Sequence, residues 1–459
     1  MPVFGRGQRT KQLDALVDEY VETGLSRREF LRRAALLGLS ATAAGALLEA
    51  CGGNTSASNT VDLLNVWSTE EQASFKAMVA PFVQQNGTKI NLESTRDLNA
   101  TLTTRLQGNN PPDIAILPNP AKMQQIAKQG KLKALNDVVD MSQLQTDYAK
   151  TWIDLGTYNS KLYAIFMKAA NKGTIWYNPQ QFSSNSYSTP SAWTDLINLS
   201  NTIAGSGKYP WSMGVSSGSA SGWPAADWID QIYLLANGPD MYDKWVAHQI
   251  PWTDASVKNA FQTFGQIAHG NHFINGAPQS ILATTFSDAT FPPFKSPPEA
   301  YMNYLGDFAV TFIKGQFPSL QAGSGYNFFP FPTISTTYPG TTTVTGGADL
   351  VTLYTDNDAA KKLVKYLATA DAQKIWAGRG GFTSVNKSVP TSVYPDAVTK
   401  ASAEMLAGAS IFRFGADDLM PSQVEDAFWK ACLQYIQDPS SLDSQLSTME
   451  STAASAYTS

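Results

Sequence analysis

Residues that build metal sites and disulfides are scarce in this chain. Its 459 residues include only two cysteines and three histidines. His248, His269 and His272 have none of the spacings found in zinc sites, and no HExxH or CxxC motif occurs. We therefore expect no metal site and no cofactor, and we interpret the histidines as surface groups or as satisfied core groups.

Clusters of basic residues are also missing. Charged residues make up 15% of the chain, and the formal net charge is −5 at pH 7. A mildly acidic chain without a basic block argues against nucleic acid as the main partner. The segment GSGK at 205–208 lacks the first glycine of a phosphate-binding loop and the Ser or Thr after the lysine. Nucleotide binding is therefore not expected either.

Long apolar runs are absent as well. The uncharged run at 34–48 is shorter than the ~20 residues that a membrane-spanning helix needs. Arginines precede it at 27, 28, 32 and 33, and small residues and Cys51 follow it. This order of positive charge, apolar segment and small residues is typical of an export signal.

Two short motifs refine the export prediction. SRREFL at 26–31 resembles the twin-arginine export motif, and LEAC at 48–51 resembles a lipobox. The resemblance implies cleavage before Cys51 and acylation of its sulfur. Glu49 departs from the lipobox pattern, where that position is usually small or hydroxylic. An amphipathic helix that carries a structural cysteine is the alternative.

These motifs divide the chain into an N-terminal export signal and the remaining body of the protein. We expect a twin-arginine lipoprotein signal peptide at 1–50 and a flexible tether at 51–60, because GGNTSASNT is small, polar and uncharged. Cys432 is the only cysteine left once Cys51 carries lipid, so no intramolecular disulfide is expected. We interpret Cys432 as a small buried apolar side chain and the body as water-soluble and tethered.

The body alternates between strand and helix patterns. Its length of about 400 residues exceeds what one core usually supports, so two lobes are expected. Strands are predicted at 61–68, 88–94 and 113–117, and apolar residues at helical spacing predict helices through 75–83, 98–106 and 123–127. Further strands are predicted at 173–179 and 344–355, and a long helix at 358–378. This alternation is typical of a parallel sheet with helices on its faces, an α/β fold.

One motif favours an enzyme. GVSSG at 214–218 fits the G-x-S-x-G pattern of a hydrolase nucleophile, and histidines lie downstream. Such a serine needs a sharp turn from a strand into a helix, and the residues that follow begin no helix immediately. An exported lipoprotein hydrolase or esterase remains the alternative function.

The aromatic residues favour a binding protein. All eleven tryptophans follow Cys51, and several stand beside polar or charged residues, as in WTD at 193–195 and at 252–254. A sugar ring has an apolar C–H face and a fringe of hydroxyls. A site for it needs flat aromatic walls with carboxylates, amides or arginine between them.

At this point the chain resembles a bacterial extracellular solute-binding protein of a carbohydrate ABC transporter. The resemblance extends over nearly all of 61–440, and the subgroup that it favours resembles alpha-glucoside binders. Its markers, in order, are NNPPDIAILPNP at 109–120, LYAIFMKAANKGTIWYNPQQF at 162–182, PSAWTDLINL at 190–199, GWPAADWIDQIYLLANGPDMYDKWVAHQIPWTD at 222–254, GGADLV at 346–351 and FRFGADDLMPSQVEDAFW at 412–429. Asn119-Pro120-Ala121 departs from the Gln-Pro-Gly often found in the family.

The resemblance implies the two-lobed fold of periplasmic binding proteins (type II), with each lobe a mixed sheet flanked by helices and a hinge between the lobes. Lobe one is expected at 61–168 plus 340–390. Lobe two is expected at 171–330 plus 391–459, which includes the C-terminal helices. The protein would capture a sugar, such as an alpha-glucoside or other oligosaccharide, in the cleft and deliver it to permease subunits in the membrane. It would break no bond, act as a monomer and stay outside the cytoplasm on its lipid anchor.

Ligand residues in this architecture lie at the carboxyl ends of strands. That rule and the family markers predict contacts from Trp67, Ser68, Glu70, Asp97, Asn119, Trp223, Asp227, Asp288, Asp349, Arg413, Asp418 and Trp429. We expect Trp223 and Trp429 to stack on the sugar, and Asp227 and Arg413 to hold its hydroxyls. The arginine often found one turn after the family's stacking residue is Leu433 here.

The lipobox generates the first testable prediction. The substitution Cys51→Ala removes the only sulfur that the motif can acylate, so the protein should move from the membrane fraction to the soluble extracytoplasmic fraction on an immunoblot. Cys432→Ala is the matched control and should leave the protein on the membrane. A Cys51→Ala protein that stays membrane-bound would show that the lipobox prediction is wrong.

Overall fold

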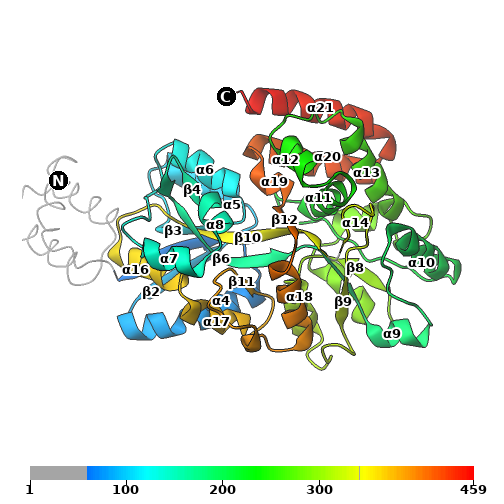
Figure 1. The fold of residues 1–459 in the computed structure, drawn as a ribbon, viewed down its shortest axis with the longest axis horizontal. Coiled ribbons are helices and arrows are strands. Elements are labelled where there is room, and N and C mark those ends of the chain that lie inside the picture. Colours follow the sequence, from blue (N-terminus) through cyan, green and yellow to red (C-terminus); the bar gives the residue numbers. More distant parts are fainter. Residues whose placement is uncertain (1–58, 341, 459) are drawn as a thin grey trace, which may run out of the picture. The chain divides into compact units, whose positions relative to one another are not determined.

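The computed structural model describes residues 59–340 and 342–458. The predicted signal at 1–50, the lipidation site Cys51 and most of the tether predicted at 51–60 lie outside the described residues. From Thr60 onward the chain forms one unit. Figure 1 shows a large sheet on one side of this unit, with a smaller sheet and a group of helices on the other. Within the described ranges, no helix is long and apolar enough to cross a membrane.

The larger sheet has seven strands in the order β11-β6-β10-β3-β1-β2, with β12 beside β10. β1 pairs in parallel with β2 and β3, which confirms the predicted strand–helix alternation, while β10 runs antiparallel to β3 and β6. The sheet is therefore mixed. Its strands are β1 (Thr60–Asn65), β2 (Lys89–Ser94), β3 (Ile114–Leu117), β6 (Ala164–Asn171), β10 (Thr343–Leu353), β11 (Thr383–Ser384) and β12 (Ile411–Phe414).

The helices beside this sheet include the predicted apolar segments, although the first of them begins at Thr69, ahead of the predicted 75–83. α4 (Thr69–Asn86) follows β1 and ends at Gly87, whose left-handed backbone (φ 63°) suits glycine. α5 (Leu98–Gln107) and α6 (Pro120–Lys128) follow β2 and β3. The other helices on this side are α7 (Met141–Asp147) and α8 (Lys150–Leu155), beside the hairpin of β4 (Thr157–Tyr158) and β5 (Lys161–Leu162).

One predicted helix is divided in two. The segment 358–378 forms α16 (Asp358–Leu367) and α17 (Ala370–Ala377) instead of one long helix. The hydroxyl of Thr369 accepts a hydrogen bond from the backbone N–H of Ala372, so it caps the start of α17. The prediction of a single helix was wrong because apolar spacing does not register a threonine cap inside the run.

β6 leads directly into the smaller sheet. Its successor β7 (Thr174–Tyr177) pairs antiparallel with β8 (Met302–Tyr304) and β9 (Asn327–Pro330). Around this sheet lie α9 (Pro179–Ser184), α10 (Trp193–Gly205), α14 (Gln279–Ala283), η1 (Asp288–Thr290), η2 (Pro292–Phe294) and α15 (Ala309–Gln316). The main helices of this side are α11 (Trp223–Asn237), α12 (Pro239–Val246), α13 (Ala255–Ala268), α19 (Ala416–Leu419), α20 (Ser422–Gln437) and α21 (Leu442–Ala456). The elements η3 (Thr391–Val393), α18 (Ala397–Ala407) and η4 (Pro439–Ser441) complete the described chain.

Separate hydrophobic cores define two lobes. The core of lobe one surrounds the seven-stranded sheet and includes Leu63, Phe166 and Trp376. The core of lobe two surrounds α11 and α20 and includes Trp228 and Phe428, and a smaller cluster packs on Trp176. Cys432 is fully buried among the apolar side chains of lobe two, as expected.

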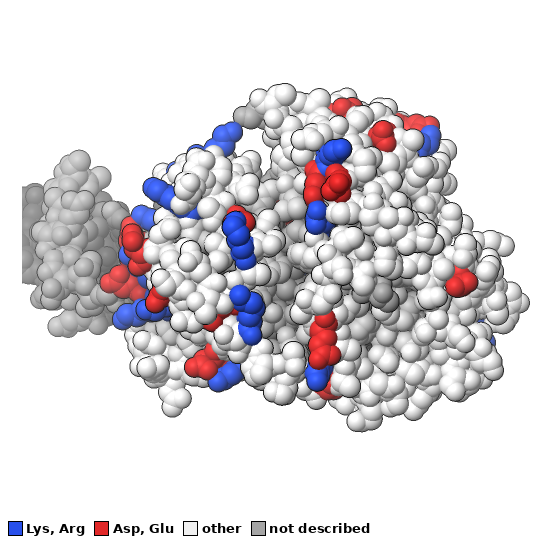
Figure 2. All heavy atoms as spheres, viewed as in Figure 1, with Lys and Arg blue, Asp and Glu red and all other residues white. Residues whose placement is uncertain are grey.

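Several charged side chains on the surface form ion pairs. On the face shown in Figure 2, Lys and Arg side chains lie beside Asp and Glu, and no large region of a single charge is seen. Lys150 and Asp154, for example, approach to 2.6 Å, and Lys295 and Glu299 to 2.8 Å. That face therefore offers no basic surface of the kind that binds nucleic acid.

A buried carboxyl joins elements at the passage between the lobes. The Oδ2 atom of Asp307 accepts hydrogen bonds from the hydroxyls of Thr383 (2.8 Å) and Ser402 (3.1 Å). The backbone N–H of Asp307 donates to the carbonyl of Asn171, the last residue of β6. Burial raises the pKa of Asp307 from 3.8 to about 6.

This shift predicts a pH-dependent stability. The folded protein holds the Asp307 proton more tightly than the unfolded chain, so the stabilisation is present below about pH 4 and is lost as the pH rises through about 6. Asp307→Asn should flatten the fall in unfolding free energy between pH 4 and 6, by on the order of 1–2 kcal/mol. Urea unfolding at constant ionic strength measures it, with the exposed Asp288→Asn as control. Identical profiles for Asp307→Asn and the unaltered protein would contradict the prediction.

Candidate ligand-binding cleft

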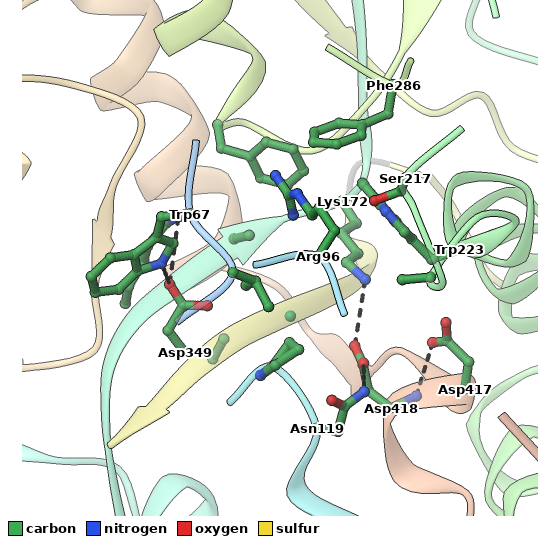
Figure 3. Close-up of a pocket in the computed structure, with 18 of the residues that line it drawn as sticks. Trp67, Arg96, Asn119, Lys172, Ser217, Trp223, Phe286, Asp349, Asp417 and Asp418 are labelled. Carbon is green, nitrogen blue, oxygen red and sulfur yellow. Dashed lines mark hydrogen bonds and ion pairs between the residues drawn. The ribbon is translucent and has the colours of Figure 1, made fainter. Parts of the chain in front are cut away.

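A cavity of about 150 Å³ lies where the two lobes face each other. Lobe one supplies its wall from the loops that follow β1, β2 and β3 and from the strands β6 and β10. Lobe two supplies the segment before α11, two phenylalanines, α19 and α20 (Figure 3). The lining residues are Val66, Trp67, Glu71, Arg96, Pro118, Asn119, Lys168, Ala169, Ala170, Gly347, Ala348 and Asp349, and opposite them Lys172, Ser217, Ala220, Trp223, Phe286, Phe308, Asp417, Asp418 and Trp429.

The first polar cluster surrounds Lys168 on β6. Its ammonium lies 2.7 Å from the carboxylate of Glu71 and 3.6 Å from that of Asp349. The indole N–H of Trp67 also donates to Asp349, at 2.8 Å (Figure 3). Burial raises the pKa of Asp349. Burial alone would raise the pKa of Glu71 as well, but Lys168 lowers it below its usual value. This wall therefore presents charges of both signs that are already paired.

The second polar cluster surrounds Lys172, just after β6. Its ammonium lies 2.6 Å from a carboxylate oxygen of Asp227 and 3.6 Å from one of Asp418. Burial raises the pKa of Asp227 to about 7, although Lys172 opposes the shift. The side-chain amide of Asn119, in lobe one, donates to Asp418 at 2.7 Å and also to Glu425. Polar side chains from both lobes therefore meet at this end of the cavity.

One group of carboxylates has a geometry that could hold a metal ion. Asp227, Asp230 and Asp417 place carboxylate oxygens within 4.8 Å of one another. Burial raises the pKa of Asp230 well above its usual value, and the neighbouring carboxylates of Asp417 and Asp227 raise it further. Lys172 already supplies a cation to Asp227.

Aromatic rings form the apolar walls. The Trp223 ring is partly exposed at the start of α11, and Trp429 on α20 is held by a 2.8 Å hydrogen bond from its indole N–H to Asp417. The guanidinium of Arg96 lies 4.6 Å from the centre of the Phe286 ring. The buried hydroxyl oxygen of Ser217 has no hydrogen-bond partner among the described residues. The cavity thus combines flat apolar surfaces with unused and charged hydrogen-bonding groups.

Part of the predicted site is brought together here. The predicted residues that line the cavity are Trp67, Asn119, Trp223, Asp349, Asp418 and Trp429. Asp227 lies behind this wall, paired with Lys172 and 2% exposed, so it positions the lysine rather than lining the cavity.

The remaining predicted residues are placed elsewhere. Ser68 caps α4, where it exchanges hydrogen bonds with Glu71, and Glu70 is exposed on the same helix. Asp97 is exposed and accepts a hydrogen bond from the backbone N–H of Ser219. Asp288 is exposed in η1. The guanidinium of Arg413 forms a bidentate pair with Asp243, at 2.6 and 2.7 Å, and does not line the cavity.

Sequence reasoning missed several lining residues. Those with polar or aromatic side chains are Glu71, Arg96, Lys168, Lys172, Ser217, Phe286, Phe308 and Asp417. A signal existed for the two lysines, because AIFMKAANK at 164–172 reads as a fully buried strand interrupted by charge. A lysine in such a strand needs a buried acidic partner, and a site is a common reason for one.

The GVSSG motif does not form a nucleophile elbow. Ser216 lies in an irregular segment whose backbone pairs with the chain at 284–286, and α11 begins only at Trp223. The histidines have other neighbours: His248 faces Glu450, His269 packs on Tyr435, and His272 stacks on Tyr209. The hydrolase alternative is therefore not supported.

The paired charges predict a cost for removing Lys172. Lys172→Met leaves Asp227 and Asp418 buried without a cation, so the unfolding free energy should fall by on the order of 3 kcal/mol at pH 7. The loss should shrink at pH 5, because burial raises the pKa values of both acids and protonating them costs less at lower pH. Denaturant unfolding at both pH values measures it, and Lys76→Met on the exposed side of α4 is the control. Unchanged stability at pH 7 would refute this account of the cluster.

Comparison with known proteins places the chain in a family. Over residues 66–374 it matches the family described as bacterial extracellular solute-binding protein. It is 33% identical over 377 residues to the osmoprotective compounds-binding protein GgtB of Synechocystis, covering 82% of this chain and 88% of that one. It is also 33% identical over 392 residues to the alpha-glucosides-binding periplasmic protein AglE of Rhizobium meliloti, covering 84% and 85%. Among solved structures, a chitin oligosaccharide binding protein superposes with a TM-score of 0.74 at 20% identity, over 87% of this chain and 99% of that one. The chain belongs to the bacterial extracellular solute-binding proteins and has their two-lobed α/β fold.

Proposed function

We propose that this protein is the substrate-binding component of an ABC importer, which captures a sugar in the interlobe cleft and delivers it to permease subunits. The observation that carries the proposal is the cavity lined by Trp223 and Trp429, where aromatic side chains occur together with carboxylates, lysines and an arginine. Such a site suits a ring with an apolar face and a fringe of hydroxyls. The alpha-glucoside-binding relative supports an alpha-glucoside or another oligosaccharide as the ligand.

The charged lining gives the proposed site its strength of binding. Hydrogen bonds that a hydroxyl donates to a carboxylate, or accepts from an ammonium, are stronger than those between neutral groups. Glu71, Asp349 and Lys168 offer such partners on one side, and Lys172 and Asp418 on the other. A sugar that bridges the cavity would therefore bond to charged groups of both lobes.

Closure of the lobes is the proposed mechanism of capture. We place lobe one at 61–168 plus 340–390, lobe two at 171–330 plus 391–459, and the hinge near 168–172 and 332–342. Within 391–459, the short strand β12 joins the sheet of lobe one. A ligand that touches both lobes only when they are closed favours the closed state. Contacts between the lobes, such as Asn119 with Asp418 and Asp97 with Ser219, would close together with the ligand.

The cellular setting follows from the same proposal. The protein would act as a monomer outside the cytoplasm, held at the membrane by lipid on Cys51. The anchor would raise its local concentration near the permease without adding a contact. It would not be an enzyme, so a bound sugar should be recovered unchanged after long incubation.

Removing an aromatic wall tests the site. Trp223→Ala and Trp429→Ala should each weaken sugar binding by on the order of 1–3 kcal/mol, because each loses a desolvated stacking surface. Calorimetry with an alpha-glucoside identified by a thermal-shift panel measures the affinity, and circular dichroism checks the fold. Trp152→Ala is the control, since Trp152 packs on Phe166 and Phe412 away from the cavity. Unchanged affinity in both cleft variants would mean that the sugar binds elsewhere.

A further inference from the structure

The loop at 214–222 contains the GVSSG motif, to which the proposed function gives no role. Its backbone pairs with the chain at 284–286, also in lobe two. The Ser221 hydroxyl accepts a hydrogen bond from the backbone N–H of Ser217 at 2.9 Å and donates one to the carbonyl of Gly218 at 2.7 Å. Contacts within lobe two therefore fix the shape of this loop.

The tip of the loop contacts the turn that precedes α5 in lobe one. The backbone N–H of Ser219 donates to Oδ1 of Asp97 at 3.0 Å, and the Ser219 hydroxyl donates to the carbonyl of Arg96 at 3.3 Å. A Cβ atom added to Gly218 would lie 3.1 Å from Cβ of Arg96 and 3.4 Å from Oδ1 of Asp97. The left-handed backbone of Gly218 (φ 61°) also favours glycine. The two lobes therefore meet closely here, with little room for a larger residue at 218.

Asp97 does not cap the helix that it precedes. It occupies the N-cap position of α5, where an aspartate side chain usually accepts a hydrogen bond from a backbone N–H of the first turn. The Asp97 side chain makes no such bond, and its Oδ1 accepts from Ser219 of the other lobe instead. The hydrogen bonds from Ser219 lower the pKa of Asp97. This side chain therefore serves the contact between the lobes rather than its own helix.

Arg96 connects this contact to the ligand cavity. Its guanidinium lies 4.6 Å from the centre of the Phe286 ring, and both residues line the inner cavity. Its backbone carbonyl is the acceptor for the Ser219 hydroxyl. Because Phe286 and Ser219 both belong to lobe two, only closed lobes hold the guanidinium in this place.

The residue before the tip of the loop faces the cavity. Ser217 lines the inner cavity, and its buried hydroxyl oxygen has no hydrogen-bond partner among the described residues (Figure 3). A buried hydroxyl without a partner costs free energy that a ligand hydroxyl can recover. One residue of the loop therefore faces the ligand, while the next two contact the opposite lobe.

We propose that residues 217–219 form a latch that couples sugar recognition to closure: the first residue bonds to the sugar through its hydroxyl, and the other two hold the Arg96–Asp97 turn. This inference rests on the proposed function, because it takes the inner cavity as the sugar site. Asp97 does not line that cavity, so it is a positioning residue that acts on affinity through the closed state alone.

Removing the lobe-one side of the latch tests the closure step. Asp97→Ala deletes the acceptor for the Ser219 N–H, so the Kd of the sugar should rise about fivefold, as loss of one charge-assisted hydrogen bond implies. The rise should appear in the dissociation rate, because the latch forms only once the lobes have closed. Calorimetry gives the Kd, and stopped-flow tryptophan fluorescence gives the rates, with a sugar identified by the thermal-shift panel.

Asp140→Ala is the matched control for Asp97→Ala. Asp140 is another exposed N-cap aspartate of lobe one, but it caps its own helix, α7, through two hydrogen bonds of 3.0 Å. Its removal should leave the Kd and both rates of sugar binding unchanged.

Two substitutions in lobe two test the other side. Gly218→Ala adds a methyl group that meets Arg96 and Asp97 only in the closed lobes, so the Kd should rise about tenfold, because overpacking opposes closure. Gly207→Ala is its control, since Gly207 is also left-handed (φ 78°) and an added Cβ there meets nothing within 4 Å. Ser217→Ala removes the hydroxyl offered to the sugar and should raise the Kd about fivefold.

Other outcomes decide against the latch or against the function itself. An unchanged Kd in Asp97→Ala, or a rise caused only by slower association, overturns the latch while the sugar-binding function stands. An unchanged Kd in Ser217→Ala overturns the coupling of the latch to the sugar. If the unaltered protein binds no sugar of the panel, the proposed function fails and the latch with it. Asp97→Ala changes an exposed side chain and carries the test if Gly218→Ala does not fold.

Discussion

Two buried lysines at the end of one strand fix the polar side of the cleft. Lys168 and Lys172 lie on and just after β6, which leaves the large sheet and enters the small one through β7. A buried ammonium is costly unless a carboxylate pairs with it. Lys168 therefore requires Glu71 and Asp349 from lobe one, and Lys172 requires acids from lobe two. The strand that connects the lobes thus orients acidic side chains of both lobes towards one space.

Local sequence patterns predicted the scaffold better than the site. The spacing of apolar residues and the capping residues determine where the strands and helices of lobe one begin and end. Trp67 and Asn119 could therefore be predicted as residues that follow strand ends. Arg413 could not be judged in this way, because its bidentate partner Asp243 is distant in sequence. Phe286 and Arg96 likewise meet only through the tertiary fold.

The lining residues that the sequence did not predict were missed for one physical reason. Taken by itself, a lysine inside an apolar strand looks like an exception to the pattern. A phenylalanine in a loop looks like an ordinary core residue. What gives them a role is a partner from a segment distant in sequence, and one sequence does not state which distant segments meet. Trp223 was predicted because an aromatic and an acidic residue stand close together in its segment, and Trp429 because its segment resembles the family's stacking position.

The charge balance of the cleft favours an uncharged ligand. On the wall of lobe one, Glu71 and Asp349 face Lys168 and Arg96, so the positive and negative groups match in number. Burial raises the pKa values of Asp227 and Asp418 beside Lys172, so protons adjust the charge there. An ionic ligand would leave one of these buried groups with an unmatched charge, which is costly in a desolvated site. A neutral polyhydroxyl molecule can donate to the carboxylates and accept from the ammonium groups without disturbing that balance, which is the behaviour that the proposed sugar receptor needs.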